Sequence, residues 1–270
     1  MQHSHSTTGQ EQSSTTGQKS SIYRKIKSTL RRLTPQPVYN LYSVFRARRI
    51  QARYKSLSCA DAFDRIYATG FWGTGASGST PHSGFGSRGR CALEYGELLE
   101  GLLRGFRTAT VADLGCGDFS VGRVIAGMAA DYVGVDIAES VIAHNARAYA
   151  GDRVRFVRAD LTRDSLPPAD VALVRQVLQH LSNAEIQAAL RNIVSTYPIV
   201  YVSDEIYTGP KCLPNLDMTH GPSTRVHFRS GVFIDQPPFN LPAKFVSDIY
   251  WGSTSVLRTW EVRAPGREMK

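Results

Sequence analysis

Between residues 110 and 203 the chain alternates short apolar runs with segments whose apolar residues recur every three or four positions. The short runs predict β-strands and the periodic segments predict α-helices. The predicted strands cover 110–114, 132–137, 154–159, 170–175 and 199–203. The predicted helices cover 120–129, 139–149 and 184–195, and Ser182 with Glu185 forms a capping-box signature before the last of them. Strands separated by helices of this length indicate βαβ units and a parallel sheet.

Two further apolar runs, 245–251 and 255–262, flank a short turn that contains Gly252, and they predict an antiparallel hairpin. The whole pattern predicts an α/β fold, a Rossmann-like three-layer sandwich with a seven-stranded, mostly parallel sheet and a C-terminal antiparallel hairpin. Residues 207–243 are irregular and rich in proline. We expect them to form an insertion over the carboxyl edge of the sheet, where open α/β sheets bind ligands.

The N-terminal part of the chain has a different composition. Residues 1–20 are mostly Ser, Thr, Gln and Gly, which favours disorder. Helical spacing of apolar residues follows at 22–33 and 38–45, then at 60–68 and 95–106, and a loop with seven glycines lies at 70–90. The expected parts are a disordered tail (1–20), a basic amphipathic helical segment (21–59), N-terminal helices with a Gly-rich lid (60–106), and the main domain (107–270).

The net charge of +9 is concentrated near the N-terminus. Residues 1–60 hold eleven Lys or Arg against one acid, Glu11, so they carry +10 and the other 210 residues sum to −1. An enzyme that grips nucleic acid over its whole face would be basic there too, so a nucleic-acid partner is less favoured. The segment 21–55 has three interpretations: peripheral contact with anionic lipid, RNA binding, or a helix packed on the main domain.

The remaining global features favour the cytoplasm. The four cysteines are scattered without a CxxC pair, so we expect neither a disulfide framework nor a metal site. The N-terminus lacks the apolar core of a secretory signal, and no apolar run approaches the roughly 18 residues that span a bilayer. The predicted location is cytoplasmic, with peripheral membrane contact as a hypothesis.

The strand at 110–114 runs into a turn that contains Gly115 and Gly117 and then into a helix. Glycines let the backbone approach a ligand closely, and the following helix N-terminus offers free N–H groups. A dinucleotide fingerprint would have a third glycine where this chain has Ser120. Asp113 would repel a pyrophosphate but would attract an ammonium group. This turn therefore favours an amino-acid ligand over NAD.

The next two strands also end in acids. Asp136 follows Asp113 by 23 residues, and Asp160 follows Asp136 by 24. A carboxylate at such a strand end can accept hydrogen bonds from both hydroxyls of a ribose. We expect the three acids to converge on one ligand, and the resemblance described next implies that it is an adenosyl-amino-acid.

In this order and spacing the segments resemble the motifs of class I S-adenosylmethionine-dependent methyltransferases over about residues 107–205, with motif I at Asp113–Asp118 and a fourth-strand motif at 169–181. The resemblance implies that residues 107–270 are an S-adenosyl-L-methionine-binding domain and that Asp160 binds the adenine amino group. It implies a cofactor site built from Asp113, Gly115, Cys116, Gly117, Asp136, Ile137, Asp160, Leu161, Arg175 and Gln176.

A second resemblance involves Trp72 and the Ser-Gly-x-Gly-Ser segment Ser83–Ser87, together with residues 236–242. These segments are similar to those of uncharacterised bacterial methyltransferases, some of them associated with polysaccharide genes. The resemblance implies that the glycine-rich loop covers the cofactor, with Trp72 and Ser87 in contact with it. The alternative is a lid anchor that makes no direct contact.

The methyl acceptor is less constrained. The fourth-strand motif has Arg175-Gln176-Val177-Leu178 where methyltransferases of base or amide nitrogen often carry an Asn/Asp-Pro-Pro-aromatic turn. We therefore predict O-methylation of a sugar, a polysaccharide precursor or another small metabolite, and a lipid-linked glycan would suit the membrane hypothesis. The alternatives are an RNA methyltransferase that uses the basic segment, a catalytically silent cofactor-binding scaffold and, third, a dehydrogenase.

An alcohol acceptor benefits from a general base. The candidates at the carboxyl ends of the fourth and fifth strands are His180, Asp204 and Glu205. The alternative interpretations are a core histidine and two loop carboxylates. His220 and His227 lie in the insertion and stay unranked.

Overall fold

A computed structural model of the chain describes residues 36–75, 80–106, 108–251 and 254–264. The chain divides into two units, Met1–Arg46 and Ala47–Lys270. Helix α2, Gln36–Ala52, confirms the helix predicted over 38–45. The disordered tail and the helix expected at 22–33 lie outside the described residues. None of the described helices combines the length and the apolar character needed to cross a membrane.

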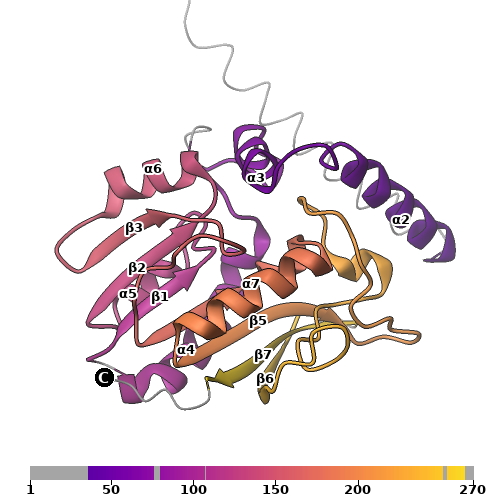
Figure 1. Ribbon diagram of the computed structural model, residues 1–270. Helices are drawn as coiled ribbons and strands as arrows, with labels where there is room; N and C mark the ends of the chain where they lie inside the picture. The colour runs from indigo at the N-terminus through magenta and orange to yellow at the C-terminus, as the bar shows by residue number, and fades with distance from the viewer. Residues whose placement is uncertain (1–35, 76–79, 107, 252–253, 265–270) are drawn as a thin grey trace, which may run out of the picture. The chain divides into compact units, whose positions relative to one another are not determined.

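The second unit is built on a seven-stranded sheet with the order β3-β2-β1-β4-β5-β7-β6 (Figure 1). Its strands are β1 (Thr110–Leu114), β2 (Asp131–Asp136), β3 (Val154–Arg158), β4 (Val171–Arg175), β5 (Ile199–Tyr207), β6 (Lys244–Tyr250) and β7 (Ser255–Arg263). The first five are parallel, and β7 pairs antiparallel with both β5 and β6. The predicted fold is confirmed. The strand order reverses between β1 and β4, and such a switch point opens a ligand crevice at the carboxyl ends of the strands.

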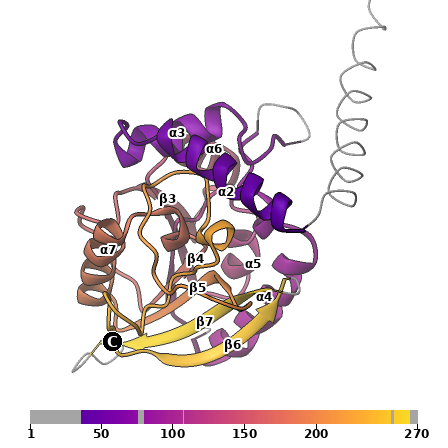
Figure 2. The same ribbon diagram turned by 90° about the vertical axis from the view of Figure 1, so that its right-hand side faces the viewer.

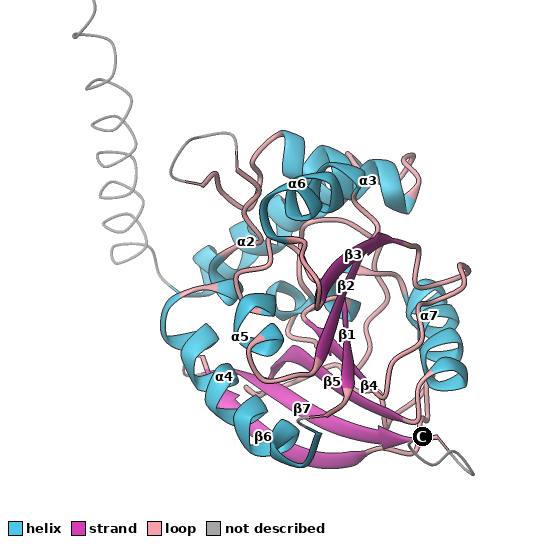
Figure 3. Cartoon of the chain, turned by 90° about the vertical axis from the view of Figure 1, so that its left-hand side faces the viewer, coloured by secondary structure: helices cyan, strands magenta, loops and turns pink. Residues whose placement is uncertain are grey.

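Helices cover both faces of the sheet (Figure 3). One face carries α4 (Gly89–Leu103) and α5 (Gly122–Ala126), and the other carries α3 (Cys59–Ala68), α6 (Glu139–Tyr149) and α7 (Asn183–Thr196). Alternation along the strands produces two cores. In β1, for example, Val111 packs in the core with α4, whereas Ala112 and Leu114 pack in the core with α7.

Two elements differ from their predicted lengths. Helix α5 covers only 122–126, because the chain leaves it in a tight turn in which the Gly127 N–H donates to the Val124 carbonyl. Strand β5 runs four residues past its predicted end, because it pairs with β7 along its whole length, from Ile199 opposite Arg263 to Tyr207 opposite Ser255. The capping box of α7 is present as predicted.

The proline-rich insertion between β5 and β6 is irregular apart from the 3-10 helix η4, Arg225–Phe228 (Figure 2 shows the β6–β7 hairpin that follows it). Arg225 is 1% exposed. A buried guanidinium is tolerated where its N–H donors find acceptors. Those of Arg225 bond the carbonyls of Leu178, Gln179, Leu181 and Leu216 and the side chain of Asn183. The insertion is thereby fastened to the segment that follows β4.

Replacing Leu173 by alanine should lower the free energy of unfolding by about 2–5 kcal/mol, because this side chain is fully buried on the central strand β4 and its loss leaves a cavity. Leu213→Ala is the matched control, since Leu213 is 55% exposed in the insertion, and it should change that free energy by less than about 0.5 kcal/mol. Urea unfolding curves measure both. Equal losses in the two variants would contradict the assignment of the core.

Candidate functional site

A cavity of about 380 Å³ lies where the parallel strands reach their carboxyl ends, a size suited to a small ligand. Its walls come from the turns after β1 to β4, from α3, from the glycine-rich segment 83–87 and from the insertion. The predicted site residues that line it are Trp72, Ser87, Asp113, Gly115, Cys116, Gly117, Asp136, Ile137, Asp160, Leu161, Arg175, Gln176, His180 and Glu205. Asp204 lies outside the lining.

The turn after β1 depends on two glycines. The N–H groups of Gly115 and Cys116 both donate to the Val135 carbonyl, at 2.7 and 3.0 Å, which ties the turn to β2. Gly115 and Gly117 have φ values of +81° and +53°, where glycine is favoured. A Cβ on Gly115 would strike the Val177 side chain, and one on Gly117 would strike Ser83. The missing side chains allow three chain segments to meet at the cavity.

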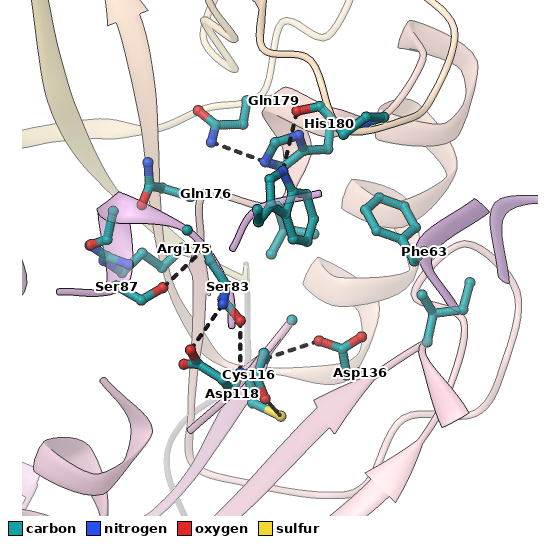
Figure 4. Close-up of a pocket in the computed structure, with 18 of the residues that line it drawn as sticks. Phe63, Ser83, Ser87, Cys116, Asp118, Asp136, Arg175, Gln176, Gln179 and His180 are labelled. Atoms are coloured by element: carbon teal, nitrogen blue, oxygen red, sulfur yellow. Dashed lines mark hydrogen bonds between the residues drawn. The ribbon is translucent and has the colours of Figure 1, made fainter. Parts of the chain in front are cut away.

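Asp136 connects β2 to this turn. Its two carboxylate oxygens accept the N–H groups of Gly117 and Ala138, each at 3.0 Å. The pKa of Asp136 is raised chiefly by burial, and these backbone donors oppose the rise. A carboxylate has about four lone-pair positions, so two stay available to a ligand. Figure 4 shows Asp136 beside the glycine turn.

Asp160 occupies the corresponding place after β3. One of its oxygens accepts the N–H and the hydroxyl of Thr162, at 2.9 and 2.7 Å, and the other pairs with Arg163 at 3.1 Å. Asp160 and the adjacent Leu161 both line the cavity. Asp113, Asp136 and Asp160 therefore all line this one cavity.

Asp113 is the most buried of the three acids and accepts the Tyr132 hydroxyl at 2.7 Å. Burial raises the pKa of Asp113 to about 6, against the effects of the Tyr132 hydrogen bond and of Arg175. The neighbouring Cys116 thiol is also buried, which raises its pKa, so it is a packing group rather than a nucleophile.

The glycine-rich segment is fastened to the turn after β1 by a reciprocal pair of hydrogen bonds (Figure 4). The Ser83 N–H donates to the Asp118 carboxylate at 2.9 Å, and the Asp118 N–H donates to the Ser83 hydroxyl at 2.8 Å. Arg88 adds an ion pair to the same carboxylate at 2.9 Å. On the other side, the Trp72 indole N–H donates to the Pro222 carbonyl at 3.3 Å. Ser83 thus ties the glycine-rich segment to the glycine turn, and Trp72, which precedes this segment in the chain, contacts the insertion.

Arg175 ends β4 inside the cavity. Its guanidinium donates to the Gly86 carbonyl and lies 4.7 Å from the centre of the Tyr95 ring. Burial lowers the pKa of Arg175. Its Nε is buried without a hydrogen-bond partner among the described residues. The residue that follows, Gln176, has a φ of +55°, an uncommon value for a side-chain-bearing residue.

A chain of hydrogen bonds fixes the His180 imidazole (Figure 4). The Glu205 N–H donates to the Gln179 side-chain oxygen at 3.3 Å, which directs the Gln179 NH₂ to His180 Nε2, also at 3.3 Å. Because the Gly221 carbonyl only accepts, His180 Nδ1 must carry the proton in their 3.2 Å contact. Burial lowers the pKa of His180 to about 4. The imidazole is therefore neutral near pH 7, with its lone pair on Nε2.

The two acids of β5, Asp204 and Glu205, lie in different environments. Glu205 lines the cavity, and burial raises its pKa. Asp204 was expected at a strand end facing the acceptor, and this placement is wrong, because β5 continues to Tyr207 and the Asp204 side chain is fully buried. It accepts the Gln179 N–H at 3.4 Å, and burial raises its pKa to about 8. Of the unranked histidines, His220 bonds Glu185 rather than the cavity.

Comparison with known proteins identifies the core of this unit. Residues 112–196 match the family model described as a methyltransferase domain. The DhpI–SAH complex structure superposes with a TM-score of 0.51 at 16% identity, covering 78% of this chain and all of DhpI. Residues 112–196 form a methyltransferase domain, and the unit has the fold of class I methyltransferases.

Other similar structures have lower scores. The N-methyltransferase NodS from Bradyrhizobium japonicum WM9, in complex with S-adenosyl-L-homocysteine, has a TM-score of 0.48 at 14% identity, covering 65% of this chain and 87% of NodS. Human N-acetylserotonin methyltransferase, in complex with SAM, has a TM-score of 0.49 at 14% identity, covering 83% of this chain and 65% of that protein. No curated protein sequence matches the chain.

Methyltransferases of this class take the methyl group from S-adenosylmethionine, and the cavity fits that cofactor. The cofactor carries a sulfonium and an ammonium, and five carboxylates line the cavity: Asp113, Asp118, Asp136, Asp160 and Glu205. Arg175 Nε is a buried donor that the cofactor carboxylate would satisfy. Asp136 would hold the ribose, and Asp160 with Leu161 would hold the adenine.

Several lining residues were not predicted as site residues, among them Tyr67, Ser83, Asp118 and Gln179. Two of them carried a signal, since Ser83 opens the Ser-Gly-x-Gly-Ser segment and Asp118 closes the glycine turn. Their mutual hydrogen bonds join residues 35 positions apart, and no periodicity in the chain reports such a contact.

Replacing Asp136 by alanine should weaken binding of S-adenosylmethionine about tenfold or more, because a hydrogen bond to a charged group contributes roughly 1.5 kcal/mol or more. Isothermal titration calorimetry with the cofactor and its demethylated product measures this. Asp131→Ala, on the exposed first residue of the same strand, is the control and should bind as the wild type does. An unchanged affinity in Asp136→Ala would remove that residue from the site.

The raised pKa of Asp204 predicts a pH-dependent stability difference between the wild type and Asp204→Asn. Between the ordinary carboxyl pKa and about 8, the folded wild type keeps a proton that the unfolded chain has lost, so its free energy of unfolding falls as the pH rises. The Asp204→Asn variant has no carboxyl group at this position, so its free energy of unfolding does not fall for this reason. The free energy of unfolding of the variant minus that of the wild type should therefore rise by at least about 1 kcal/mol from pH 5 to pH 8.5. One unit of pKa shift corresponds to about 1.4 kcal/mol. A difference that stays constant over this range, measured by urea unfolding, would refute a protonated Asp204.

Proposed function

We propose that this methyltransferase transfers a methyl group to a hydroxyl of a small neutral acceptor, a sugar of a polysaccharide precursor being the preferred class. The charge of the cavity carries the proposal. Arg175 is the one cationic side chain among the described residues that line it, and its guanidinium is engaged by Gly86 and Tyr95. A phosphate or carboxylate on the acceptor would lack an ion-pair partner there.

The topology of the sheet supports an acceptor site in one half of the cavity. The tips of β1, β2 and β3 carry the acids assigned to the cofactor, so the space over β4 and β5 is left for the acceptor. That half holds Trp72, Gln179, His180, Glu205 and Trp251. Indole rings pack on the apolar faces of sugars, while the amide, imidazole and carboxylate offer hydrogen bonds to hydroxyls.

His180 is the proposed general base. When bound, S-adenosylmethionine supplies a methyl group on a sulfonium that is activated for in-line displacement. The acceptor hydroxyl donates to His180 Nε2 in place of the long contact with Gln179, and Nε2 receives the proton as the hydroxyl oxygen attacks. The Gly221 carbonyl keeps Nδ1 protonated and the ring oriented. Glu205 accepts a hydrogen bond from a neighbouring hydroxyl of the acceptor.

The test offers the purified full chain with labelled S-adenosylmethionine a panel of neutral glycosides, sugar phosphates and total RNA. We expect methyl transfer to a member of the neutral set, identified by mass spectrometry as a methyl ether. Preferred transfer to the phosphorylated sugars or to RNA would reject the proposal. So would cofactor binding without turnover on any of the panel, which indicates a silent scaffold.

With that acceptor, His180→Gln should lower kcat about 100-fold or more while the affinity for S-adenosylmethionine stays within twofold, because general-base catalysis contributes roughly 10²–10⁴-fold. His144→Gln on α6, outside the cavity lining, is the control and should retain activity. A variant at His180 that turns over at the wild-type rate would exclude its role as base.

A further inference from the structure

A second cluster of reactive side chains lies where α3, α7 and the insertion meet. It consists of Cys59 at the first residue of α3, Glu185 in the first turn of α7, and His220 of the insertion. One sulfur, one carboxylate oxygen and one ring nitrogen of these residues all lie within 4.8 Å of one another. Cys59 also lines the cavity, but none of the three side chains has been assigned to the cofactor or the acceptor.

Two of these side chains, those of His220 and Glu185, are positioned by neighbours. His220 Nε2 donates to the Leu57 carbonyl at 3.1 Å, which turns Nδ1 toward Glu185, 2.7 Å from its Oε1. The other oxygen of Glu185 accepts the N–H and the hydroxyl of Ser182, at 2.8 and 2.7 Å. In metalloproteins a ligating histidine almost always gives its second N–H to a carbonyl, carboxylate or water, and ligating carboxylates are themselves hydrogen-bonded. The cluster reproduces both features.

The surroundings of the cluster are negative. Burial and, after it, the carboxylates of Glu185, Asp160 and Asp136 raise the pKa of the Cys59 thiol. An acidic cluster around a thiol and an imidazole is a favourable place for a cation. His220 and Glu185 are only 13% and 23% exposed in their side chains, so a bound ion would be largely shielded from water.

We propose that Cys59, Glu185 and His220 bind one zinc ion through Sγ, Oε1 and Nδ1, with water as a fourth ligand. Zinc accepts thiolate, imidazole and carboxylate together and favours four-coordinate sites, whereas magnesium and calcium prefer oxygen alone. On binding, the ion replaces the thiol proton and the proton shared by Nδ1 and Oε1, and both protons pass to solvent. The ligands come from positions 59, 185 and 220, so no spacing motif marks them.

A zinc ion at this site would stabilise the orientation of His180, the proposed general base. Gly221 directly follows His220, and its carbonyl accepts His180 Nδ1–H while its N–H donates to the His180 carbonyl at 3.0 Å. A metal that fixes His220 would therefore fix the backbone that orients His180. It would also tie α3, which carries Phe63 and Tyr67 of the cavity wall, to the start of α7.

The experiment measures zinc in the full chain. The purified protein is stripped with a chelator, reloaded with zinc alone, passed over a desalting column and analysed by atomic emission. We expect one zinc per chain in the wild type. Competition with a chromophoric zinc chelator should show affinities at least about 100-fold lower in Cys59→Ser and His220→Gln, since even changes in the residues that support a metal ligand cost 10–100-fold.

Matched controls exclude other ligands. Cys91→Ser changes a free cysteine elsewhere in the fold, and a variant with His3→Gln and His5→Gln removes the two histidines of the N-terminal tail. Both should keep the wild-type zinc content. Cobalt(II) in place of zinc should give a thiolate charge-transfer band that Cys59→Ser abolishes, and far-ultraviolet circular dichroism checks that each variant is folded.

Two results would overturn the proposal. Either the wild type retains no zinc after desalting, so that His220 and Glu185 form an ion pair only, or Cys59→Ser and His220→Gln hold zinc as tightly as the wild type does. Neither result depends on the identity of the methyl acceptor.

Discussion

The carboxylate of Asp136 is the interaction on which the site depends. It ends β2, yet its two oxygens hold the N–H groups of Gly117, after β1, and Ala138, before α6. One side chain therefore fixes the separation of two strand tips at the point where a ligand must lie between them. Burial raises the pKa of this group, and the backbone donors offset part of the cost of keeping it charged; ribose hydroxyls would add to them in a complex with the cofactor.

The position of the glycine-rich segment 83–87 depends on the same turn. Gly117 can be approached closely only because it has no Cβ, and the Ser83 side chain occupies the space that a Cβ would take. Ser83 then exchanges hydrogen bonds with Asp118, so the residue that ends the glycine turn also anchors the glycine-rich segment 83–87. A larger residue at Gly117 would therefore disturb both the turn after β1 and the glycine-rich segment 83–87, although the two segments lie far apart in the chain.

The sequence was informative wherever a local pattern decides the structure. Strand periodicity placed Asp113, Asp136 and Asp160 at three strand ends, and parallel pairing necessarily brings such ends to one edge of a sheet. The sequence did not predict the features that depend on contacts between distant segments. The length of β5 is set by its pairing with β7, so Asp204 lies inside the strand rather than at its end. No periodic pattern predicts the four hydrogen bonds by which Arg225 holds Leu178, Gln179, Leu181 and Asn183 in the segment after β4.

In the proposed mechanism, these distant contacts allow His180 to act as a base beside a cationic methyl donor. A protonated imidazole would repel the sulfonium, and in a buried site that repulsion is poorly screened. Desolvation lowers the pKa of His180, the Gly221 carbonyl fixes its neutral tautomer, and the buried charge of Arg225 lowers its pKa further. Arg225 also holds the backbone at Leu178 and Gln179, so one side chain of the insertion both places the imidazole and keeps it uncharged until the acceptor proton arrives.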